Sequence, residues 1–333
     1  MIPRVVIVLF LMALNASLHA DILYVLGTNK IEKYSTTGTD LGTFANHSLS
    51  YPAGLAFDST GNLYAANQLF GPYIEKFSLG GVDLGHFASG PSLNLPTGIA
   101  VDGIGNLYVA NQGATSVERF SSLGLDLGQF ATGLNLPVSP AFDSAGNLFV
   151  TNHGTNTVER FSPAGTDIGA FVSGGLSNPT SILFDQAGNL YVQNNFIGIL
   201  GISTTTSWIE KFSPSGVDLG VFANTGSVFP SSLAFDSTGN LYAAINNTIE
   251  KFSASGTDLG VFASGLNGAS GLAFTDDSGI PLVLPPTPIP EPSTFCLLGM
   301  GAAFFATRRA RRSATQRKNK TPPTRAFRFS IRR

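Results

Sequence analysis

The sequence predicts an all-β protein, a six-bladed β-propeller built from four-stranded antiparallel blades. One line of sequence recurs five times, as in "GLAFDSTGNLYAAN" from Gly54 and "SLAFDSTGNLYAAI" from Ser232. The repeats begin 39 to 51 residues apart, the period of propeller blades. Only 12% of the 333 residues are charged and 38 are glycine, a composition typical of short strands and tight turns.

Each full repeat contains four segments in a fixed order. An apolar run ending in Asp leads through a Gly-Asn turn to a run such as "LYVAN". After a variable loop come a run such as "VERFS", a glycine-containing turn and "DLGxF". Short apolar runs separated by turn residues predict four antiparallel strands in each repeat.

The two ends of the repeat region together complete a sixth blade. The last repeat contains only its first strand, "SGLAFTDDSG" from Ser270, and the missing strands are "ILYVLG", "KIEKYS" and "DLGTFA" near the N-terminus. A blade shared in this way closes the ring and leaves no unpaired ends. We therefore assign residues 21–279 to the propeller. The apolar "IPLVLPP" from Ile280 either adds to the closing sheet or begins a Pro-rich linker, assigned to 280–289.

The repeated side chains have predicted structural roles. The glycine of each Gly-Asn turn supplies the positive φ of a hairpin, and the Asp before it accepts the amide hydrogens of that turn. A ring of Asp residues also suggests calcium, but each serves its own hairpin with no second carboxylate nearby. The third-strand phenylalanines fill the core. These residues are Asp58, Asp102, Asp143, Asp185 and Asp236, and Phe77, Phe120, Phe161, Phe212 and Phe252.

Each third strand also carries a Glu-Lys or Glu-Arg pair, such as Glu75-Lys76. Adjacent residues of a strand point to opposite faces. We expect the Glu of one blade to meet the base of the next in exposed pairs that contribute about 0–1 kcal/mol each.

The line "PTGIAVDGIGNLYVAN" from Pro96 resembles the NHL repeat, and five repeats share its Pro-x-Gly-hydrophobic-x-x-Asp and Gly-Asn-Leu-Tyr pattern more or less closely. The resemblance extends from Ile22 to Phe274 and implies a propeller. It implies little about activity, because function resides in sites and not in folds.

The N-terminus has the layout of a secretory signal peptide, assigned to residues 1–20. Arg4 precedes an apolar run from Val5 to Leu14, and mostly small and polar residues follow up to Ala20. We expect cleavage before Asp21, and the alternative is an uncleaved anchor.

The C-terminal region predicts a membrane anchor. Sixteen uncharged residues lie between Glu291 and Arg308, a short span for a transmembrane helix. The arginines behind them favour a cytoplasmic tail, assigned to 313–333, with the propeller exported. We interpret Cys296, which lies in this helix, as a packing residue.

This order of elements resembles the PEP-CTERM sorting signal of Gram-negative bacteria, assigned to 290–312. The resemblance implies an exosortase-type membrane protease as a partner and an association with exopolysaccharide at the cell surface or outside it. The long tail departs from the family pattern, and a plain anchor is the alternative. The residues that carry the resemblance are Pro290, Glu291, Pro292, Arg308, Arg309, Arg311 and Arg312.

Charge argues against a nucleic-acid partner. Between Asp21 and Glu291 the chain has 21 acidic and only seven basic residues. A surface that binds phosphates needs clustered Lys and Arg.

The variable loops carry the candidate binding site. They join the second strand to the third within a blade and link successive blades, so they share one face of the propeller. Variable loops on a rigid scaffold are where binding usually occurs. The longest, "NNFIGILGISTTTSW", contains the only Trp of the chain. Candidate ligand-binding residues are Trp208, Phe196, Tyr73, Asn194, Asn152, Asn111 and Asn67, although the recurrent Asn is first a structural consensus.

No loop on this face contains Asp or Glu. Acid–base chemistry needs a titratable group, and the metal-dependent lactonases of the gluconolactonase-like family gather carboxylates at this pore. His47 and His153 are the remaining titratable candidates, and we interpret them as surface residues. We therefore expect a non-catalytic module without cofactor or metal that binds polysaccharide or a surface protein. The alternatives are a propeller hydrolase or lyase and a structural surface protein without a ligand.

Overall fold

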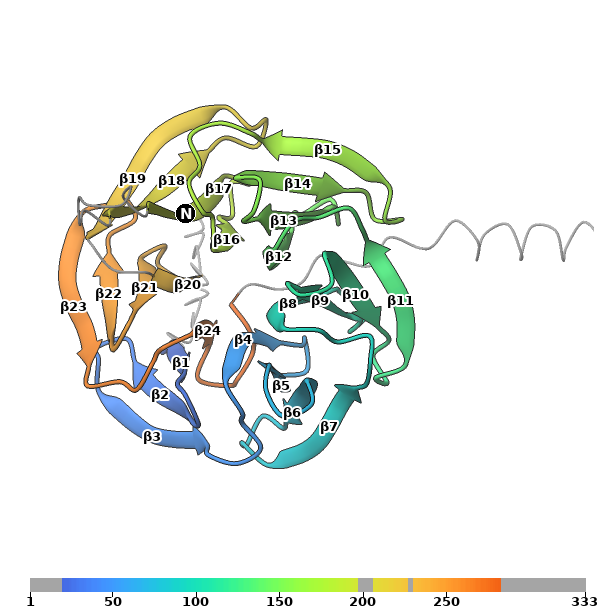
Figure 1. Cartoon of the computed structure of the whole chain (residues 1–333). Helices are drawn as coiled ribbons and strands as arrows, with labels where there is room; N and C mark the ends of the chain where they lie inside the picture. The colour runs from blue at the N-terminus through green and yellow to red at the C-terminus, as the bar shows by residue number, and fades with distance from the viewer. Residues whose placement is uncertain (1–19, 197–205, 227–229, 283–333) are drawn as a thin grey trace, which may run out of the picture. The chain divides into compact units, whose positions relative to one another are not determined.

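Each repeat of the sequence folds into one four-stranded blade. The computed structural model describes residues 20–196, 206–226 and 230–282, and these residues form six antiparallel sheets arranged as a ring (Figure 1). The six-bladed propeller predicted from the repeats is therefore confirmed. In every blade the first strand of the repeat lies nearest the central axis and the last lies at the rim (Figure 1).

The strands fall where the sequence places them. The first blade contains β4 (Pro52–Phe57), β5 (Leu63–Asn67), β6 (Tyr73–Phe77) and β7 (Asp83–Ser89). The second contains β8 (Pro96–Val101), β9 (Leu107–Asn111), β10 (Ser116–Phe120) and β11 (Asp126–Ala131). The third contains β12 (Pro137–Phe142), β13 (Leu148–Asn152), β14 (Thr157–Phe161) and β15 (Asp167–Val172).

In the fourth blade the last three strands are longer than their counterparts in the other blades, and the first is shorter. It contains β16 (Ser181–Phe184), β17 (Leu190–Phe196), β18 (Thr206–Phe212) and β19 (Asp218–Gly226). The fifth contains β20 (Pro230–Phe235), β21 (Leu241–Ile245), β22 (Thr248–Phe252) and β23 (Asp258–Ser264). The sixth, here called the closing blade, combines β24 (Gly271–Thr275) with β1 (Ile22–Leu26), β2 (Ile31–Ser35) and β3 (Asp40–Ala45).

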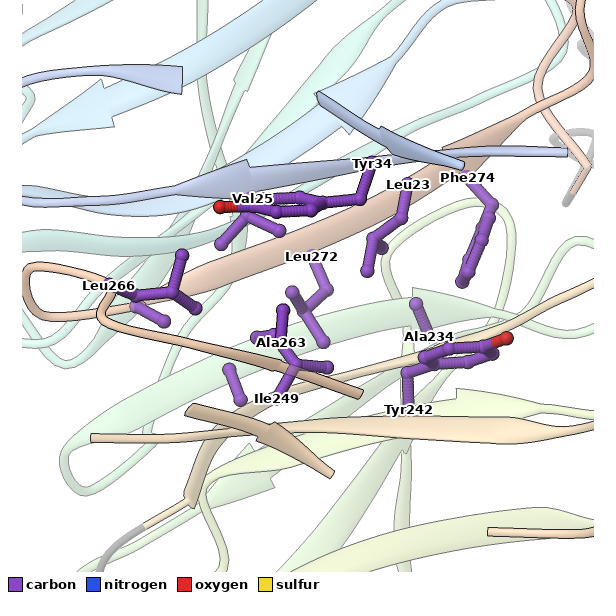
Figure 2. Close-up of a cluster of buried hydrophobic side chains, with 12 residues drawn as sticks. Leu23, Val25, Tyr34, Ala234, Tyr242, Ile249, Ala263, Leu266, Leu272 and Phe274 are labelled. Carbon is purple, nitrogen blue, oxygen red and sulfur yellow. The ribbon is translucent and has the colours of Figure 1, made fainter. Parts of the chain in front are cut away.

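The closing blade joins the two ends of the propeller as predicted. β1 pairs with β24 from Ile22 opposite Thr275 to Leu26 opposite Gly271. Figure 2 shows side chains of this blade, among them Leu23 and Phe274, packed against Tyr242 of the fifth blade. The chain then adds one more pairing to this sheet, because Thr275 bridges Pro281 and the amide of Leu282 donates to the carbonyl of Phe274 at 3.1 Å.

The Asp hairpins also form as predicted. Asp58 Oδ1 accepts the amides of Thr60 at 2.9 Å and Asn62 at 3.0 Å, and Oδ2 accepts the Asn62 side-chain amide at 2.8 Å. Burial raises the pKa of Asp58, but these hydrogen bonds outweigh it and hold the pKa below its ordinary value. The same hairpin bonds recur at Asp102, Asp143, Asp185 and Asp236.

The third-strand phenylalanines are fully buried, as expected, but the prediction for the Glu-Lys pairs is wrong. Glu75 is 0% exposed, and Lys76 lies over the rings of Tyr64 and Phe87 within its own blade. Lys251 likewise lies over Tyr242 of its own blade. Because adjacent residues alternate in direction, the Glu enters the blade while the base lies on aromatic faces, which attract cations.

The rim strands carry a bulge in every blade. In β7 the amide of Gly85, which has φ of 87°, donates to Asp83 Oδ1 at 2.8 Å. Equivalent bonds occur at the Asp-Leu-Gly or Asp-Ile-Gly sequence of the other five rim strands. Bulges of this kind interrupt the exposed strand edge and discourage edge-to-edge aggregation.

Several predicted segments lie outside the described residues. They are the signal peptide up to residue 19, most of the insert of the fourth blade, and the chain from residue 283 onward with its linker, sorting signal and tail. Within the described part of the chain, no helix has the length and hydropathy needed to cross a membrane.

Candidate functional site

Two cavities with different chemistry open on the central axis of the propeller. The smaller, about 210 Å³, lies where the inner strands end and is lined by apolar side chains such as Phe57, Phe142 and Phe235. The larger, about 540 Å³, lies where the inner strands begin, beside the variable loops. The lining of the larger cavity, here called the polar cavity, contains no Asp, Glu, Lys or Arg among the described residues.

The floor of the polar cavity is formed by hydroxyl side chains that join neighbouring inner strands. Thr97 Oγ1 donates to the carbonyl of Val138 at 2.9 Å, from the second blade to the third. Ser231 Oγ donates to Ala269 at 2.8 Å and Ser270 Oγ to Pro52 at 2.9 Å, each again reaching the next blade. These hydroxyls therefore hold the blades together, and only their lone pairs remain for a ligand.

The upper wall of the cavity comes from the variable loops. Tyr51 and Gln68 lie on the side of the first blade, and Asn178 and Asn195 lie on the opposite side, at the fourth. His153 of the third blade lies beside them, and its Nδ1 is buried without a hydrogen-bond partner among the described residues.

The polar groups of the Tyr51 and Gln68 side chains are available to a ligand. Neither side chain forms a hydrogen bond with another described residue. The Tyr51 side chain is prominently placed, because 58% of its surface is exposed. The cavity thus offers neutral donors and acceptors beside an exposed aromatic ring.

Four predicted Asn ligands face the protein instead of the cavity. Asn67 Oδ1 accepts the amide of Ser50 at 2.7 Å, and Asn111 Oδ1 accepts that of Asn94 at 3.2 Å. Asn152 and Asn194 make the same contact with the link before their own blade, to the amides of Asn135 and Ser177. All four are buried and none lines the polar cavity. Their amides fasten each inter-blade link to the second strand, the structural role that their recurrence suggested.

The two predicted aromatic ligands of the third strands lie away from the cavity. Tyr73 stacks on His86 at 4.2 Å between ring centroids and donates to the carbonyl of Ser48 at 3.1 Å. Trp208 Nε1 donates to Glu210 Oε2 at 2.6 Å. Neither Tyr73 nor Trp208 lines the polar cavity, whereas Phe196 at the end of β17 is 41% exposed.

The glutamates next to these aromatics have unusual electrostatics. Burial, with the nearby Asp83, raises the pKa of Glu75 to about 8. Burial also raises the pKa of Glu210 to about 7, although the hydrogen bond from Trp208 opposes the shift. These carboxyl groups lie inside their blades, so their chemistry is not presented to the polar cavity.

Sequence reasoning did not assign the residues of the upper wall to the binding site, and it interpreted His153 as a surface residue. Gln68, His153 and Asn195 each follow directly after one of the recurrent Asn residues. The sequence signal for these positions is their variability. The Asn is the same in these three blades, whereas the residue after it is Gln, His or Asn. A position that the repeat does not dictate is free to carry specificity.

The family model for the PEP-CTERM protein-sorting motif matches residues 288–312. The match confirms the sorting signal predicted around Pro290, Glu291 and Pro292. It implies export, membrane-anchored sorting and processing by an exosortase in Gram-negative bacteria. A search of curated proteins finds no match to the sequence.

Solved structures share the propeller fold at low sequence identity. A chain of the nidogen–laminin complex has a TM-score of 0.66 at 20% identity, covering 77% of this chain and 99% of that one. A protein of unknown function from Bacteroides caccae has a TM-score of 0.59 at 15% identity, covering 76% and 98%. A protein provisionally assigned as a gluconolactonase has a TM-score of 0.52 at 16% identity, covering 69% and 87%.

At such identities the likeness establishes the fold alone. Together with the motif match, it identifies an exported protein that joins a six-bladed β-propeller of NHL-like repeats to a PEP-CTERM sorting motif.

Proposed function

We propose that this protein is a non-catalytic binding module of the cell surface or surrounding matrix, and that its polar cavity binds a neutral carbohydrate such as exopolysaccharide. The observation that carries the proposal is the lining of the polar cavity. Hydroxyls and amides, with the exposed ring of Tyr51, surround a volume of about 540 Å³. That volume lies within the range of about 300–1,000 Å³ typical of small-molecule sites.

The charge of the cavity supports a neutral ligand. Its described lining has no Asp, Glu, Lys or Arg to pair with an ionic ligand, and the propeller around it is strongly acidic. Polysaccharides with many hydroxyl groups match a wall of amides and hydroxyls, while an aromatic ring packs on the apolar face of a sugar.

The same lining supports a non-catalytic role. Hydrolysis or elimination needs a positioned acid, base or nucleophile. Among the described lining residues only His153 carries an imidazole, and no carboxylate lies in the wall to orient it.

Binding is tested with the full-length chain in detergent. Calorimetric titration with the host's own exopolysaccharide and a panel of neutral oligosaccharides should give saturable binding. Gln68→Ala and Tyr51→Ala should each weaken it about tenfold, since a lost hydrogen bond or ring contact costs about 1–1.5 kcal/mol. The matched control is Ile104→Ala, an exposed side chain in the hairpin after β8, which should leave binding unchanged.

Three results would point elsewhere. Absence of saturable binding across the panel would favour a structural protein. Capture of a surface protein through the same residues would replace the sugar by a protein partner. Turnover of lactones or esters, lost in His153→Gln, would establish an enzyme.

A further inference from the structure

Neighbouring inner strands approach one another closely at the floor of the polar cavity. A Cβ placed on Gly54 of β4 would lie 2.3 Å from the carbonyl oxygen of Thr97 in β8. Gly98 of β8 approaches β12 as closely, with 2.5 Å from such a Cβ to the carbonyl oxygen of Val138. Backbones this close, joined by the Thr97, Ser231 and Ser270 hydroxyls, leave little room between blades at this level.

The lining of the central axis changes from polar to apolar at this level. No described residue lines both cavities. In β4, for example, Pro52 to Leu55 line the polar cavity, and Ala56 and Phe57 line the apolar one. A ligand entering from the variable loops therefore meets an apolar continuation of the axis, which does not suit the hydroxyl groups of a sugar.

The groups available to a ligand lie on two opposite walls. Asn178 and His153 line the side of the third and fourth blades, where Asn178 Nδ2 already donates to the carbonyl of Asn195 at 3.0 Å and His153 Nδ1 is buried. Tyr51 and Gln68 face them from the first blade. This arrangement suits one sugar ring held between the two walls. The third and fourth blades offer hydrogen bonds on one side, and Tyr51 and Gln68 offer an aromatic contact and an amide on the other.

Two exposed aromatic side chains lie close in sequence to lining residues, Phe70 to Gln68 and Phe196 to Asn195. Phe70, in the loop between β5 and β6, is 92% exposed, and Phe196 of β17 is exposed on the opposite blade. Exposed aromatics beside a polar cavity can contact sugars beyond the first one.

We propose that the polar cavity recognises the end of a neutral glycan chain, with the terminal sugar between Tyr51 and the Asn178–His153 wall. An internal segment cannot satisfy this geometry, because both of its continuations would have to leave through the same mouth. This inference rests on the proposed function and specifies which part of the carbohydrate is bound.

Counting binding sites per mass of polymer tests the inference. The host exopolysaccharide is titrated into the full-length chain before and after partial acid hydrolysis, at equal total mass. End recognition predicts that binding capacity rises in proportion to the number of chain ends. Recognition of internal segments predicts a capacity that follows mass, and that result would overturn the inference while leaving the proposed function intact.

Two variants add a readout that a folding defect would not mimic. Phe70→Ala should weaken binding of long fragments several-fold yet leave a disaccharide unaffected, since only longer chains reach the rim. Tyr51→Ala should weaken both by about tenfold, and Tyr51→Phe should retain ring packing and most of the affinity. Equal losses for short and long fragments in Phe70→Ala would argue against a chain that enters by its end.

Reduction of the reducing ends with borohydride then assigns the polarity of the chain. Loss of binding identifies the reducing end, and retained binding identifies the non-reducing end. If neither intact nor hydrolysed polymer binds at all, the proposed function fails and the inference fails with it.

Discussion

In three blades, the side chain two residues before the third-strand glutamate contacts its carboxylate. Trp208 donates its indole N–H to Glu210, Thr157 donates to Glu159 at 2.6 Å, and Lys30 lies 2.5 Å from Glu32. Residues i and i+2 of a strand share a face, so these pairs form within one strand. In these blades the residue in this position helps to set the environment of the carboxylate.

Trp208 should therefore report the protonation of Glu210. It is the only Trp, and it donates directly to a carboxyl whose pKa burial raises to about 7. We expect its fluorescence to titrate with a midpoint near pH 7 under native conditions. Glu210→Gln should abolish the transition, whereas Glu118→Gln in the second blade should preserve it. A transition unchanged in Glu210→Gln would refute the assignment.

At the scale of the element, two kinds of contact hold the strands and the inter-blade links in place. In four blades an Asn at or near the end of the second strand fastens the link preceding its blade. The inner strands approach one another at a position occupied by glycine or serine. Gly54 and Gly98 stand where the third, fourth and fifth blades have Ser139, Ser181 and Ser232. Ser232 Oγ accepts the amide of Leu272 in the closing blade at 3.0 Å.

Substitution of Asn111 should reduce the stability of the fold, whereas substitution of the neighbouring Gln112 should not. Asn111→Ala leaves the amide of Asn94 and the carbonyl of Ser92 without their partner. We expect a loss of about 1–3 kcal/mol in the free energy of unfolding, measured by urea denaturation. The control, Gln112→Ala, should cost less than about 0.5 kcal/mol. Comparable losses in both variants would count against the fastening role.

Serine should not be interchangeable with glycine in the inner strands. In Gly98→Ser the new Cβ would lie 2.6 Å from Pro140 Cδ and within 3 Å of the β12 backbone. We expect a loss of about 1–3 kcal/mol by urea denaturation, typical of overpacking. Ser232→Gly should cost about 1 kcal/mol through its lost hydrogen bond. A neutral Gly98→Ser variant would show that the second and third blades can separate.

For the whole molecule, buried acids make stability depend on pH. Glu75, with a pKa of about 8, and Glu210, with a pKa of about 7, ionise near 4.5 when unfolded. A raised native pKa stabilises the fold fully below the unfolded value, and this contribution is lost as pH rises through the native one. The hairpin carboxyls Asp58 and Asp236 have lowered pKa values, so their contribution is lost in strong acid.

The propeller should therefore be more stable at pH 5 than at pH 8. Each of the two glutamates should remove about 1.4 kcal/mol per pH unit between its unfolded and native pKa values. Urea denaturation at a series of pH values measures the slope. Glu75→Gln should flatten it, because the neutral amide no longer titrates. Stability that rises from pH 5 to pH 8 would contradict this account.

The fold was predictable because the same pattern of strands and turns recurs in five repeats. Turn residues such as Gly61 and core residues such as Phe77 obey local rules that any one repeat reveals. The shared closing blade followed from counting strands. The sequence did not predict that the Glu75 side chain points into its blade. Adjacent residues of a strand alternate in direction, but this alternation does not say which of the two faces the interior.

The site was less accessible to sequence reasoning. The variable face was predicted to carry binding, and it holds the larger cavity, but the residues in the wall depend on packing between segments. Asn67 bonds to Ser50, 17 residues earlier, across a link of variable length. Trp208 was assigned to a loop, yet β18 begins at Thr206 and directs the indole toward Glu210.

The shared blade also constrains the order in which the chain can fold. β1 is among the first segments to emerge during synthesis and export, but its partner β24 ends at Thr275. Until that strand arrives, β1 has an unpaired edge, and closing a loop of this length carries a large entropic cost. A chain interrupted earlier would be an open ring with a hydrogen-bonding edge, prone to join other such chains. Only a polypeptide that extends through β24 can therefore close the ring.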